Sequence, residues 1–484
     1  MRQMVRIRDW RRSRLCGIGF VQWSGADCSR DGMGLTAVCA VIYNQVLSKS
    51  NIYSSLGAAL QRAVTMRTGR GAKAAICAAM CVAVGAIVGC GSSYRPVVSA
   101  FNPVGPAAQP QKFVVAVSNP GPGLPGLVTI ADVFGDTILA TPKVGQNPKY
   151  FTLSGGGFTG YVINGDGTVN SFGISSTVQT SDILQSTLLA GSAANSIFAG
   201  SNFVYISTPG RNTVGVFQGA PAAFKQELPV GANPVYVVGS NNASRLYAIS
   251  QGANQVSSID AANNTISNVI PVGQGPVYGV MSGDARRAFI LNQGSGTVSV
   301  INTQTDQLDS TPTITVGQSP LWADISLTNN ELVVLNGGSA GGVGSVSIVN
   351  VPLCLPSSPV GNPTCSATNP VDAVGFGQVV ATVPVGKSPR MVSVLQDGTR
   401  AYVANHDDGT VSVVNLATGT VTATIPIAGH PIYIVATTGT PTGKVFVVCD
   451  DSRQMTVINT NTDTVTANPI DLQGLGVSVR VTSQ

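Results

Sequence analysis

Short runs in which β-branched and aromatic residues alternate with polar ones follow one another along most of this chain, with Gly, Asn and Asp at the joints. One stretch shows the order clearly, with runs at 390–395, 401–405, 410–415 and 420–426. The pairs Asp397-Gly398 and Asp408-Gly409 between them are typical of tight turns. The pattern predicts four consecutive antiparallel strands, here called A to D.

A phrase of the form Val-Gly-x-x-Pro comes before most of the predicted A strands. It begins at Val144, Val230, Val272, Val316 and Val385, and Ile427 begins a variant. From Pro234 onward the successive prolines lie 42, 44, 69 and 42 residues apart, while Pro148 lies 86 residues before Pro234. The interval of 86 fits two units, one of which lacks the phrase. This period is typical of repeats that each form one four-stranded sheet.

The chain contains eight predicted B–C–D sets. They begin near Lys112, Phe158, Phe203, Leu246, Ala288, Leu332, Ala401 and Lys444. A single sheet of this kind cannot bury both of its faces, whereas sheets stacked face to face around an axis cover one another. We therefore expect an all-β β-propeller of eight four-stranded blades over residues 112–484, with seven blades as the alternative. The last strand, 477–482, is expected to complete the first blade.

The seventh unit carries the most specific motif. Its B strand, Tyr402-Val403-Ala404-Asn405, is followed by Gly409-Thr410-Val411-Ser412-Val413-Val414-Asn415 and resembles the YVTN-family (YncE-like) β-propeller repeat. Weaker copies occur at 288–302 and 445–459. The resemblance covers about residues 112 to 484 and implies the propeller fold, but it says little about activity. Members of this family commonly have seven blades.

Residues 66–89 have the features of a secretory signal: a basic start, a short apolar stretch from 74 to 89 and small residues before the cut. Ile87-Val88-Gly89-Cys90 resembles a bacterial lipobox, which implies that Cys90 is lipidated. Gly91 after it resembles the residue found in lipoproteins sorted to the outer membrane. The alternatives are an ordinary cleaved signal or a membrane anchor with a coincidental cysteine.

The segments on either side of this signal have separate predictions. Residues 1–65 are expected to be a non-native or disordered extension, because a complete signal starts at Met66. Residues 90–111 are expected to be a tether with a first strand near 97–100. The mature protein should therefore be exported and lipid-anchored in the cell envelope, facing the periplasm or the surface, with the lipid as its only membrane contact.

The charge of the chain is unevenly distributed. Residues 1–89 hold 12 of the 27 Lys and Arg residues and three of the 22 Asp and Glu residues, which leaves 15 basic against 19 acidic residues in the rest. Nucleic-acid binding depends on clustered basic residues that neutralise phosphates, and no such cluster follows residue 90. We therefore expect no nucleic-acid partner.

Strand alternation places the B–C turns and the D–A connections of all blades on one face. Polar residues expected there, several of them from units seven and eight, are Lys387, Arg390, His406, Asp407, Asp408, His430, Asp450, Asp451, Arg453 and Arg211. They are interpreted either as a polar ligand pocket or weak metal site around the two histidines, or as solvated loop residues. The interpretation as loop residues is favoured, and no metal site is assigned because two histidines without a third ligand at metal-binding spacing are a poor zinc signature.

An aromatic residue recurs two positions after the repeat proline. The series is Tyr150, Tyr236, Tyr278, Trp322 and Tyr433, with Met391 as the exception. These rings could surround the channel mouth and stack on a ligand, or they could pack between adjacent blades. Packing is the favoured interpretation because the faces of a blade receive most strand side chains.

The cysteines of the predicted propeller are expected to stabilise the fold and not to take part in redox catalysis. Cys354 and Cys365 lie in an extra segment of the sixth unit and are expected to pair in an oxidising envelope, at a gain of about 3 kcal/mol. Cys449 falls inside a B strand and is expected to be a buried thiol.

No catalytic or cofactor motif is present, since the sequence contains no Gly-x-Ser-x-Gly, His-Glu-x-x-His, P-loop, dinucleotide or calcium-loop pattern. We expect no cofactor and no catalytic residues. The resulting prediction is a non-enzymatic envelope binding or scaffold protein for a protein, peptide or glycan ligand. A lactonase-like propeller hydrolase is the alternative. It would require Asp407, Asp408, His430 and Arg390 to converge within about 5 Å, because catalytic groups must share one reacting atom.

Overall fold

A computed structural model describes residues 112–240, 244–326, 328, 330–351, 375–437 and 443–482 of the 484-residue chain. The predictions for 1–65, 66–89, 90–111 and Cys90 lie outside the described residues, as do those for Cys354 and Cys365. Within the described part, no helix has the length and apolar character needed to cross a bilayer.

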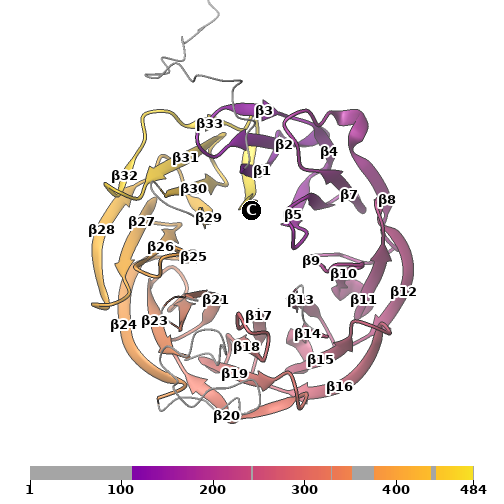
Figure 1. Cartoon of the computed structure of the whole chain (residues 1–484), viewed down its shortest axis with the longest axis vertical. Coiled ribbons are helices and arrows are strands. Elements are labelled where there is room, and N and C mark those ends of the chain that lie inside the picture. The colour runs from indigo at the N-terminus through magenta and orange to yellow at the C-terminus, as the bar shows by residue number, and fades with distance from the viewer. Residues whose placement is uncertain are drawn as a thin grey trace, which may run out of the picture. The chain divides into compact units, whose positions relative to one another are not determined.

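Eight antiparallel sheets stand around a common axis, as Figure 1 shows in a view down that axis. The inner strands β5, β9, β13, β17, β21, β25 and β29 surround the centre, and the outer strands β8, β12, β16, β20, β24, β28 and β32 form the circumference. The predicted all-β propeller with eight four-stranded blades is therefore confirmed, and the seven-blade alternative is wrong.

The first three blades in chain order contain several strands of only three or four residues. Blade 1 consists of β1 (Phe113–Asn119), β2 (Pro125–Asp132), β3 (Ile138–Ala140), β4 (Lys143–Gln146) and β34 (Leu475–Val481). Blade 2 consists of β5 (Pro148–Leu153), β6 (Thr159–Asn164), β7 (Thr168–Gly173) and β8 (Leu184–Thr187). Blade 3 consists of β9 (Ser196–Ala199), β10 (Phe203–Thr208), β11 (Thr213–Gln218) and β12 (Ala223–Pro229). No repeat phrase precedes the inner strand β9 of blade 3, and this blade still forms a complete sheet.

The next three blades follow the repeat closely. Blade 4 consists of β13 (Pro234–Val238), β14 (Arg245–Ser250), β15 (Gln255–Asp260) and β16 (Thr265–Pro271). Blade 5 consists of β17 (Pro276–Met281), β18 (Arg287–Asn292), β19 (Thr297–Asn302) and β20 (Gln307–Thr315). Blade 6 consists of β21 (Pro320–Ser326), β22 (Glu331–Asn336), β23 (Val343–Asn350) and β24 (Gln378–Lys387).

The last two blades complete the ring. Blade 7 consists of β25 (Pro389–Val394), β26 (Arg400–Asn405), β27 (Thr410–Asn415) and β28 (Thr420–Pro426). Blade 8 consists of β29 (Pro431–Ala436), β30 (Lys444–Cys449), β31 (Gln454–Asn459), β32 (Thr464–Val465) and β33 (Ile470–Asp471). Three short 3₁₀ turns are η1 (Thr180–Asp182), η2 (Pro209–Arg211) and η3 (Gln251–Ala253). All eight predicted B strands begin within one residue of the observed ones.

The two ends of the propeller meet in blade 1. Strand β34 is the inner strand of that blade and pairs antiparallel with β1, with Arg480 opposite Val115. The backbone of Thr482 donates to the Phe113 carbonyl at 2.9 Å, and the Phe113 backbone donates to the Thr482 hydroxyl at 2.9 Å. The predicted closure by the final strand is confirmed. It joins residues more than 350 positions apart into one sheet.

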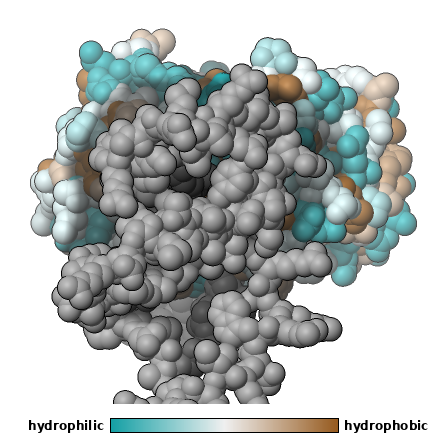
Figure 2. All heavy atoms as spheres, turned by 90° about the horizontal axis from the view of Figure 1, so that it is seen from above, coloured by the Kyte–Doolittle hydropathy of each residue, from teal (hydrophilic) through white to brown (hydrophobic). Residues whose placement is uncertain are grey.

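Burial explains the sequence pattern of the strands. The B strand of blade 5, β18, is buried at every position, whereas the D strand of blade 4, β16, alternates between exposed and covered positions. Apolar clusters cross from one blade to the next; one cluster joins Val333 and Leu335 of blade 6 to Val392 and Val403 of blade 7. Each middle strand is thus sandwiched between neighbouring blades, and outer strands meet solvent on one side. The side shown in Figure 2 mixes hydrophilic and hydrophobic residues on the described surface.

The glycine of the repeat phrase is explained by a buried asparagine at the end of the B strand. The Asn405 amide donates to the Thr410 hydroxyl at 3.1 Å and to the Ser412 hydroxyl at 2.9 Å. The Gly386 backbone donates to Asn405 Oδ1 at 3.1 Å, and a Cβ on Gly386 would lie 2.6 Å from Asn405 Cγ. The same close approach occurs at Gly145 with Asn164, Gly273 with Asn292 and Gly317 with Asn336. The phrase therefore keeps space for a buried amide.

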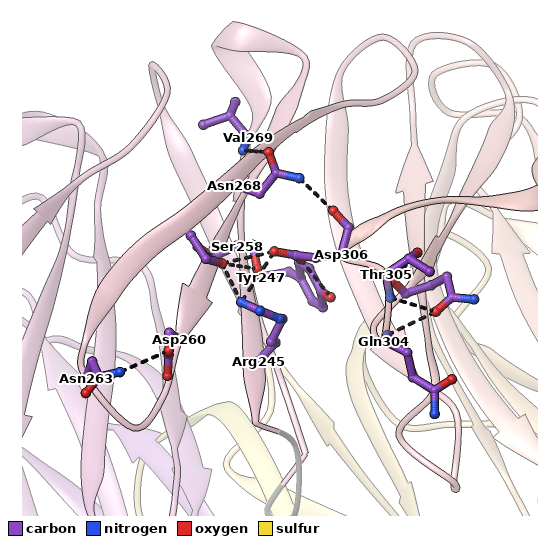
Figure 3. A network of polar contacts seen from close by, with 12 residues as sticks. Arg245, Tyr247, Ser258, Asp260, Asn263, Asn268, Val269, Gln304, Thr305 and Asp306 are labelled. Carbon is purple, nitrogen blue, oxygen red and sulfur yellow. Dashed lines mark hydrogen bonds and ion pairs between the residues drawn. The ribbon is translucent and has the colours of Figure 1, made fainter. Parts of the chain in front are cut away.

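Polar contacts also join each of several B strands to the C–D turn of the next blade, as Figure 3 shows for blades 4 and 5. We call such a contact between a B-strand tyrosine and a C–D turn a clamp. The hydroxyl of Tyr247 in blade 4 donates to Asp306 Oδ1 at 3.3 Å, and Arg245 Nη1 lies 3.4 Å from Asp306 Oδ2. The Asn268 amide donates to the Asp306 carbonyl at 2.6 Å. Asp306 sits in the C–D turn of blade 5 with φ 57°, a conformation in which Asp and Asn are enriched.

Equivalent clamps recur around the ring. Tyr402 donates to Asp463 at 2.5 Å and Arg400 lies 2.6 Å from the same carboxylate, while Tyr205 donates to Asn264 at 2.7 Å. Between blades 6 and 7 both residues of the clamp are replaced. Val333 occupies the B-strand position of the tyrosine, and Gly419 occupies the turn position, with φ 61°. The Tyr and Asp or Asn positions therefore form matched pairs across blade boundaries.

Replacing Gly386 with Ala tests the packing of the repeat phrase. We expect Gly386→Ala to destabilise the protein by about 1–3 kcal/mol, because the added methyl group overlaps Asn405. The matched control is Gly173→Ala, where a Cβ would meet no atom within 4 Å. Urea unfolding followed by circular dichroism measures the difference, and equal midpoints for the two variants would contradict the steric explanation.

Candidate functional site

The connections on one face of blades 7 and 8 bring five titratable side chains together. His406 and Asp407 lie in the turn between β26 and β27, His430 lies between β28 and β29, and Asp450 and Asp451 lie between β30 and β31. We call these five residues the loop cluster. Their proximity confirms that B–C turns and D–A connections share a face, as strand alternation predicted.

His406 is the centre of the loop cluster. Its Nδ1 lies 2.6 Å from Asp407 Oδ1, and its Nε2 lies 3.2 Å from Asp450 Oδ2. Its ring centroid is 5.1 Å from that of His430. The Ser388 hydroxyl also donates to Asp407. The hydrogen bonds from Ser388 and His406 hold the pKa of Asp407 below its usual range.

His430 and Asp451 form the second half of the loop cluster. His430 donates its backbone N–H to Asp451 Oδ1 at 2.7 Å, and its Nδ1 lies 2.7 Å from Asp451 Oδ2. These contacts hold the pKa of Asp451 below its usual range, with the backbone bond as the larger cause. His430, Asp450 and Asp451 offer ligand atoms that all lie within 4.8 Å of one another.

The other predicted face residues do not join this cluster in one crevice. Asp408 accepts a hydrogen bond from the Lys387 backbone at 2.8 Å, and Arg390 is exposed in β25. Asp407 and Asp408 are not in the group whose ligand atoms converge with His430. Arg211 belongs to blade 3, where it forms an ion pair of 2.6 Å with Glu227. Asp407, Asp408 and His430 therefore do not form one group of converging ligand atoms among the described residues.

Four of the five predicted aromatics are in mutual contact. The Tyr236 and Tyr278 centroids are 4.7 Å apart, Tyr278 and Trp322 stack at 4.1 Å, and Trp322 meets Tyr433 edge to face at 5.8 Å. They come from the inner strands of blades 4, 5, 6 and 8, so they can meet only on the axis side of the ring. Met391 of blade 7 is instead buried in a blade core, which leaves space for Trp322 to reach Tyr433.

An arginine that the sequence did not point to completes this group. The Arg480 guanidinium carbon lies 4.5 Å from the centroid of the Tyr433 ring, in cation–π geometry. Arg480 is also close enough to Tyr150, Tyr236 and Tyr278 to interact with them electrostatically. We call the six residues Tyr150, Tyr236, Tyr278, Trp322, Tyr433 and Arg480 the axial cluster. All six are half-buried, so they pack against blade cores and still face the axis.

The axial cluster contains one positive charge, that of Arg480. Burial acts against the charged form of Arg480, but the surrounding tyrosines outweigh it, and its pKa lies above the usual value. Burial raises the pKa of Tyr236, Tyr278 and Tyr433, which are therefore neutral phenols at physiological pH. No carboxylate of the described residues forms an ion pair with Arg480; its Nη1 donates to the Val479 carbonyl at 3.3 Å.

Asp324 is the acidic side chain whose pKa is affected by the charge of Arg480. It lies two residues beyond Trp322 in β21, and its carboxylate accepts backbone hydrogen bonds of 2.8 Å from Val394 and Ile325. Burial raises its pKa, while these bonds and Arg480 act in the opposite direction. Neither Arg480 nor Asp324 is marked by the repeat phrase, and an ionisable residue within an inner strand is the only signal that could have revealed them.

Comparisons with known proteins agree on the fold and do not define a family. No protein-family model and no curated protein matches the chain. Apo AztD from Citrobacter koseri is similar over 76% of this chain and 97% of its own, with a TM-score of 0.52 and 13% identity. The dihydro-heme d1 dehydrogenase NirN, in complex with DHE, is similar over 78% of this chain and 77% of its own, with a TM-score of 0.58 and 11% identity. At such low identity these likenesses show only that the chain is an eight-bladed β-propeller.

Cys449 provides a chemical test of the packing beneath the loop cluster. It is a free, fully buried thiol in β30, and burial raises its pKa to about 12. We expect alkylation by iodoacetamide at pH 8 to be at least about a hundredfold slower in the native protein than in guanidinium chloride, because the thiolate is the nucleophile. Peptide mass spectrometry of the segment 445–453 measures the rate of alkylation. Equal rates in both conditions would show that Cys449 is accessible to the reagent in the native protein.

Proposed function

We propose that this chain is a non-enzymatic binding propeller of the cell envelope that holds carboxylate-bearing ligands at its axial cluster. On this proposal it is a lipoprotein attached through Cys90 and a relative of YVTN-family (YncE-like) propellers. The lipobox at 87–90 and the Tyr402-Val403-Ala404-Asn405 repeat motif support those two parts. The carboxylate would belong to a peptide C-terminus or to an acidic glycan.

The observation that carries the proposal is that no carboxylate of the described residues forms an ion pair with the Arg480 guanidinium. Buried charges in proteins are normally paired, because the desolvated ion is costly without a counter-charge. Within the described part Arg480 contacts ring faces, the Tyr433 side chain and one main-chain carbonyl, so several of its five N–H donors are left for another acceptor. A carboxylate matches that donor geometry and can accept two parallel hydrogen bonds.

The aromatic rings around Arg480 set the shape of the site. Tyr278 stacks on Trp322 and Tyr236 is tilted against Tyr278, so these ring faces are partly covered by one another. The ring edges and the tyrosine hydroxyls are then what a ligand can contact. The Tyr433 hydroxyl is buried and makes no hydrogen bond of normal geometry within the described part. Neutral phenol donors beside a guanidinium favour an anionic ligand over a neutral one.

The separate partners of Asp407 and Asp408 support binding rather than the hydrolase alternative. Asp408 is held by the Lys387 backbone and Asp407 by Ser388 and His406, so these carboxylates have separate structural partners. Catalytic groups in a hydrolase must reach one substrate atom together. Among the described residues, Asp407 and Asp408 do not converge with His430 in this way.

Trp322 can report binding directly. Besides Trp322 the chain has Trp10 and Trp23, so a Trp10→Phe/Trp23→Phe background isolates the signal of the axial cluster. One pair of ligands is a hexapeptide with a free C-terminal carboxylate and its C-terminal amide. The other pair is trigalacturonate and the neutral sugar maltotriose. We expect at least one acid to change Trp322 fluorescence in a saturable manner and its neutral counterpart to have no effect.

Arg480→Met keeps the length of the side chain and removes its charge. We expect the affinity for the acidic ligand to fall at least about tenfold, since a hydrogen bond to a charged group contributes about 1.5–3 kcal/mol. Lys225→Met, at an exposed position of β12, is the matched control and should bind normally. Failure of both acids to bind, or equal losses in both variants, would refute the proposal. Chromatography of the recovered ligand separates binding from hydrolysis, because cleaved ligand would favour the enzyme alternative.

A further inference from the structure

The two histidines of the chain lie in contact although 23 residues separate them in the sequence, and they belong to different connections. His406 follows β26 of blade 7, and His430 precedes β29 of blade 8. Three carboxylates, from Asp407, Asp450 and Asp451, contact these rings directly. Imidazole and carboxylate groups together are the donors that bind first-row divalent ions in proteins.

The spacing of the donor atoms fits one ion. Ligand atoms of His430, Asp450 and Asp451 lie within 4.8 Å of one another, and His406 Nε2 is 3.2 Å from Asp450 Oδ2. Two donors bound to one Zn²⁺ at about 2.0–2.2 Å each lie about 3–4 Å apart. Three of the donors already converge, and His406 adjoins them through Asp450, so side-chain rotation is what would bring His406 onto the same ion.

The hydrogen bonding of His406 is incomplete without an added positive charge. Both ring nitrogens face carboxylate oxygens, at 2.6 Å and 3.2 Å. A neutral imidazole has only one N–H, so it can donate to only one of these carboxylates. If Nδ1–H donates to Asp407, then Nε2 presents a lone pair towards Asp450. Two acceptors face each other there unless a cation or a second proton lies between them.

A metal ion on Nε2 completes this arrangement. With an ion on Nε2, the bond from Nδ1–H to Asp407 becomes the outer carboxylate contact that orients metal-binding histidines. The His430 ring lies beside that of His406, at a centroid distance of 5.1 Å. The side chain of Arg390 lies near Asp407, but three carboxylates still outweigh that single cation.

The backbone holds part of the cluster in place. The His430 N–H anchors Asp451 Oδ1 at 2.7 Å, which leaves Oδ2 directed at the His430 ring. Gly429 adopts φ 120°, and a Cβ there would lie 2.6 Å from Asp451 Oδ1. A glycine at this position is therefore what allows the carboxylate to approach the loop.

We propose that His406, His430, Asp450 and Asp451 form a binding site for a first-row divalent transition ion such as Zn²⁺ or Co²⁺, with Asp407 positioning His406. The site is open to solvent, because the His430 side chain is 49% exposed. An open position on the ion is therefore available to a water molecule or a ligand. The site is separate from the axial cluster in its residues, so this inference stands independently of the proposed function.

Nuclear magnetic resonance of the two histidines gives a direct test with the full chain carrying no polyhistidine tag. Paramagnetic Co²⁺ is titrated while the two imidazole Cε1–H signals are recorded. We expect both signals to broaden together and the effect to saturate at one ion per chain. This readout does not respond to metal bound by cysteines elsewhere. Two unaffected signals at one equivalent of Co²⁺ would overturn the proposal.

Variants and competing ions define the ligands. Asp450→Asn should lower the affinity for Co²⁺ at least tenfold, whereas Asp397→Asn, in the A–B turn of blade 7, should leave it unchanged. Equal affinities in Asp450→Asn and the wild type would contradict the assignment. Zn²⁺ at equimolar concentration should displace Co²⁺ and restore both signals, while a hundredfold excess of Mg²⁺ should not. Displacement by Mg²⁺ would show that the site does not select for nitrogen-binding ions.

Discussion

The structure depends on one constraint: a four-stranded blade cannot cover its own two faces, so each blade needs a neighbour on both sides. The middle strands are buried at almost every position because adjacent blades enclose them. A ring is the arrangement that leaves no blade without a neighbour. Strand β34 closes that ring by pairing with β1, so the inner strand of blade 1 comes from the opposite end of the described chain.

The repeat phrase shows how strongly the packing restricts the sequence. In four blades a glycine lies over the buried asparagine that ends the B strand. Blade 8 varies both positions: Cys449 stands where Asn405 stands in blade 7, and Ala428 stands in the place of Gly386. A thiol needs less room than an amide and its hydrogen bonds, so the added methyl group can be accommodated. The clamp between blades 6 and 7 varies in the same paired manner, with Val333 opposite Gly419.

The fold could be predicted from the sequence because every blade repeats the same solution. Turn residues, alternating apolar positions and the phrase before six of the eight inner strands located all eight B strands and the closing strand. The loop cluster was partly predicted, since strand alternation alone places Asp407 and His430 on one face. Their partners could not be predicted in detail, because turn side chains are directed by local geometry. The place of Arg480 could not be predicted, because no repeat phrase precedes β34. The register of β34 with β1 sets the direction of the Arg480 side chain towards the axis.

Departures from the repeat are therefore more informative than the repeat itself. A residue that recurs from blade to blade is explained by the packing that all blades share. A residue that occurs in one blade is not explained by that packing. Arg480, Asp324, His406 and His430 are each found in a single blade, and they fall in blades 6, 7, 8 and 1. These four blades are consecutive in the ring, because the closure by β34 makes blade 1 the neighbour of blade 8. The same strand pairing that completes the fold thus brings these four ionisable residues to one side of the propeller.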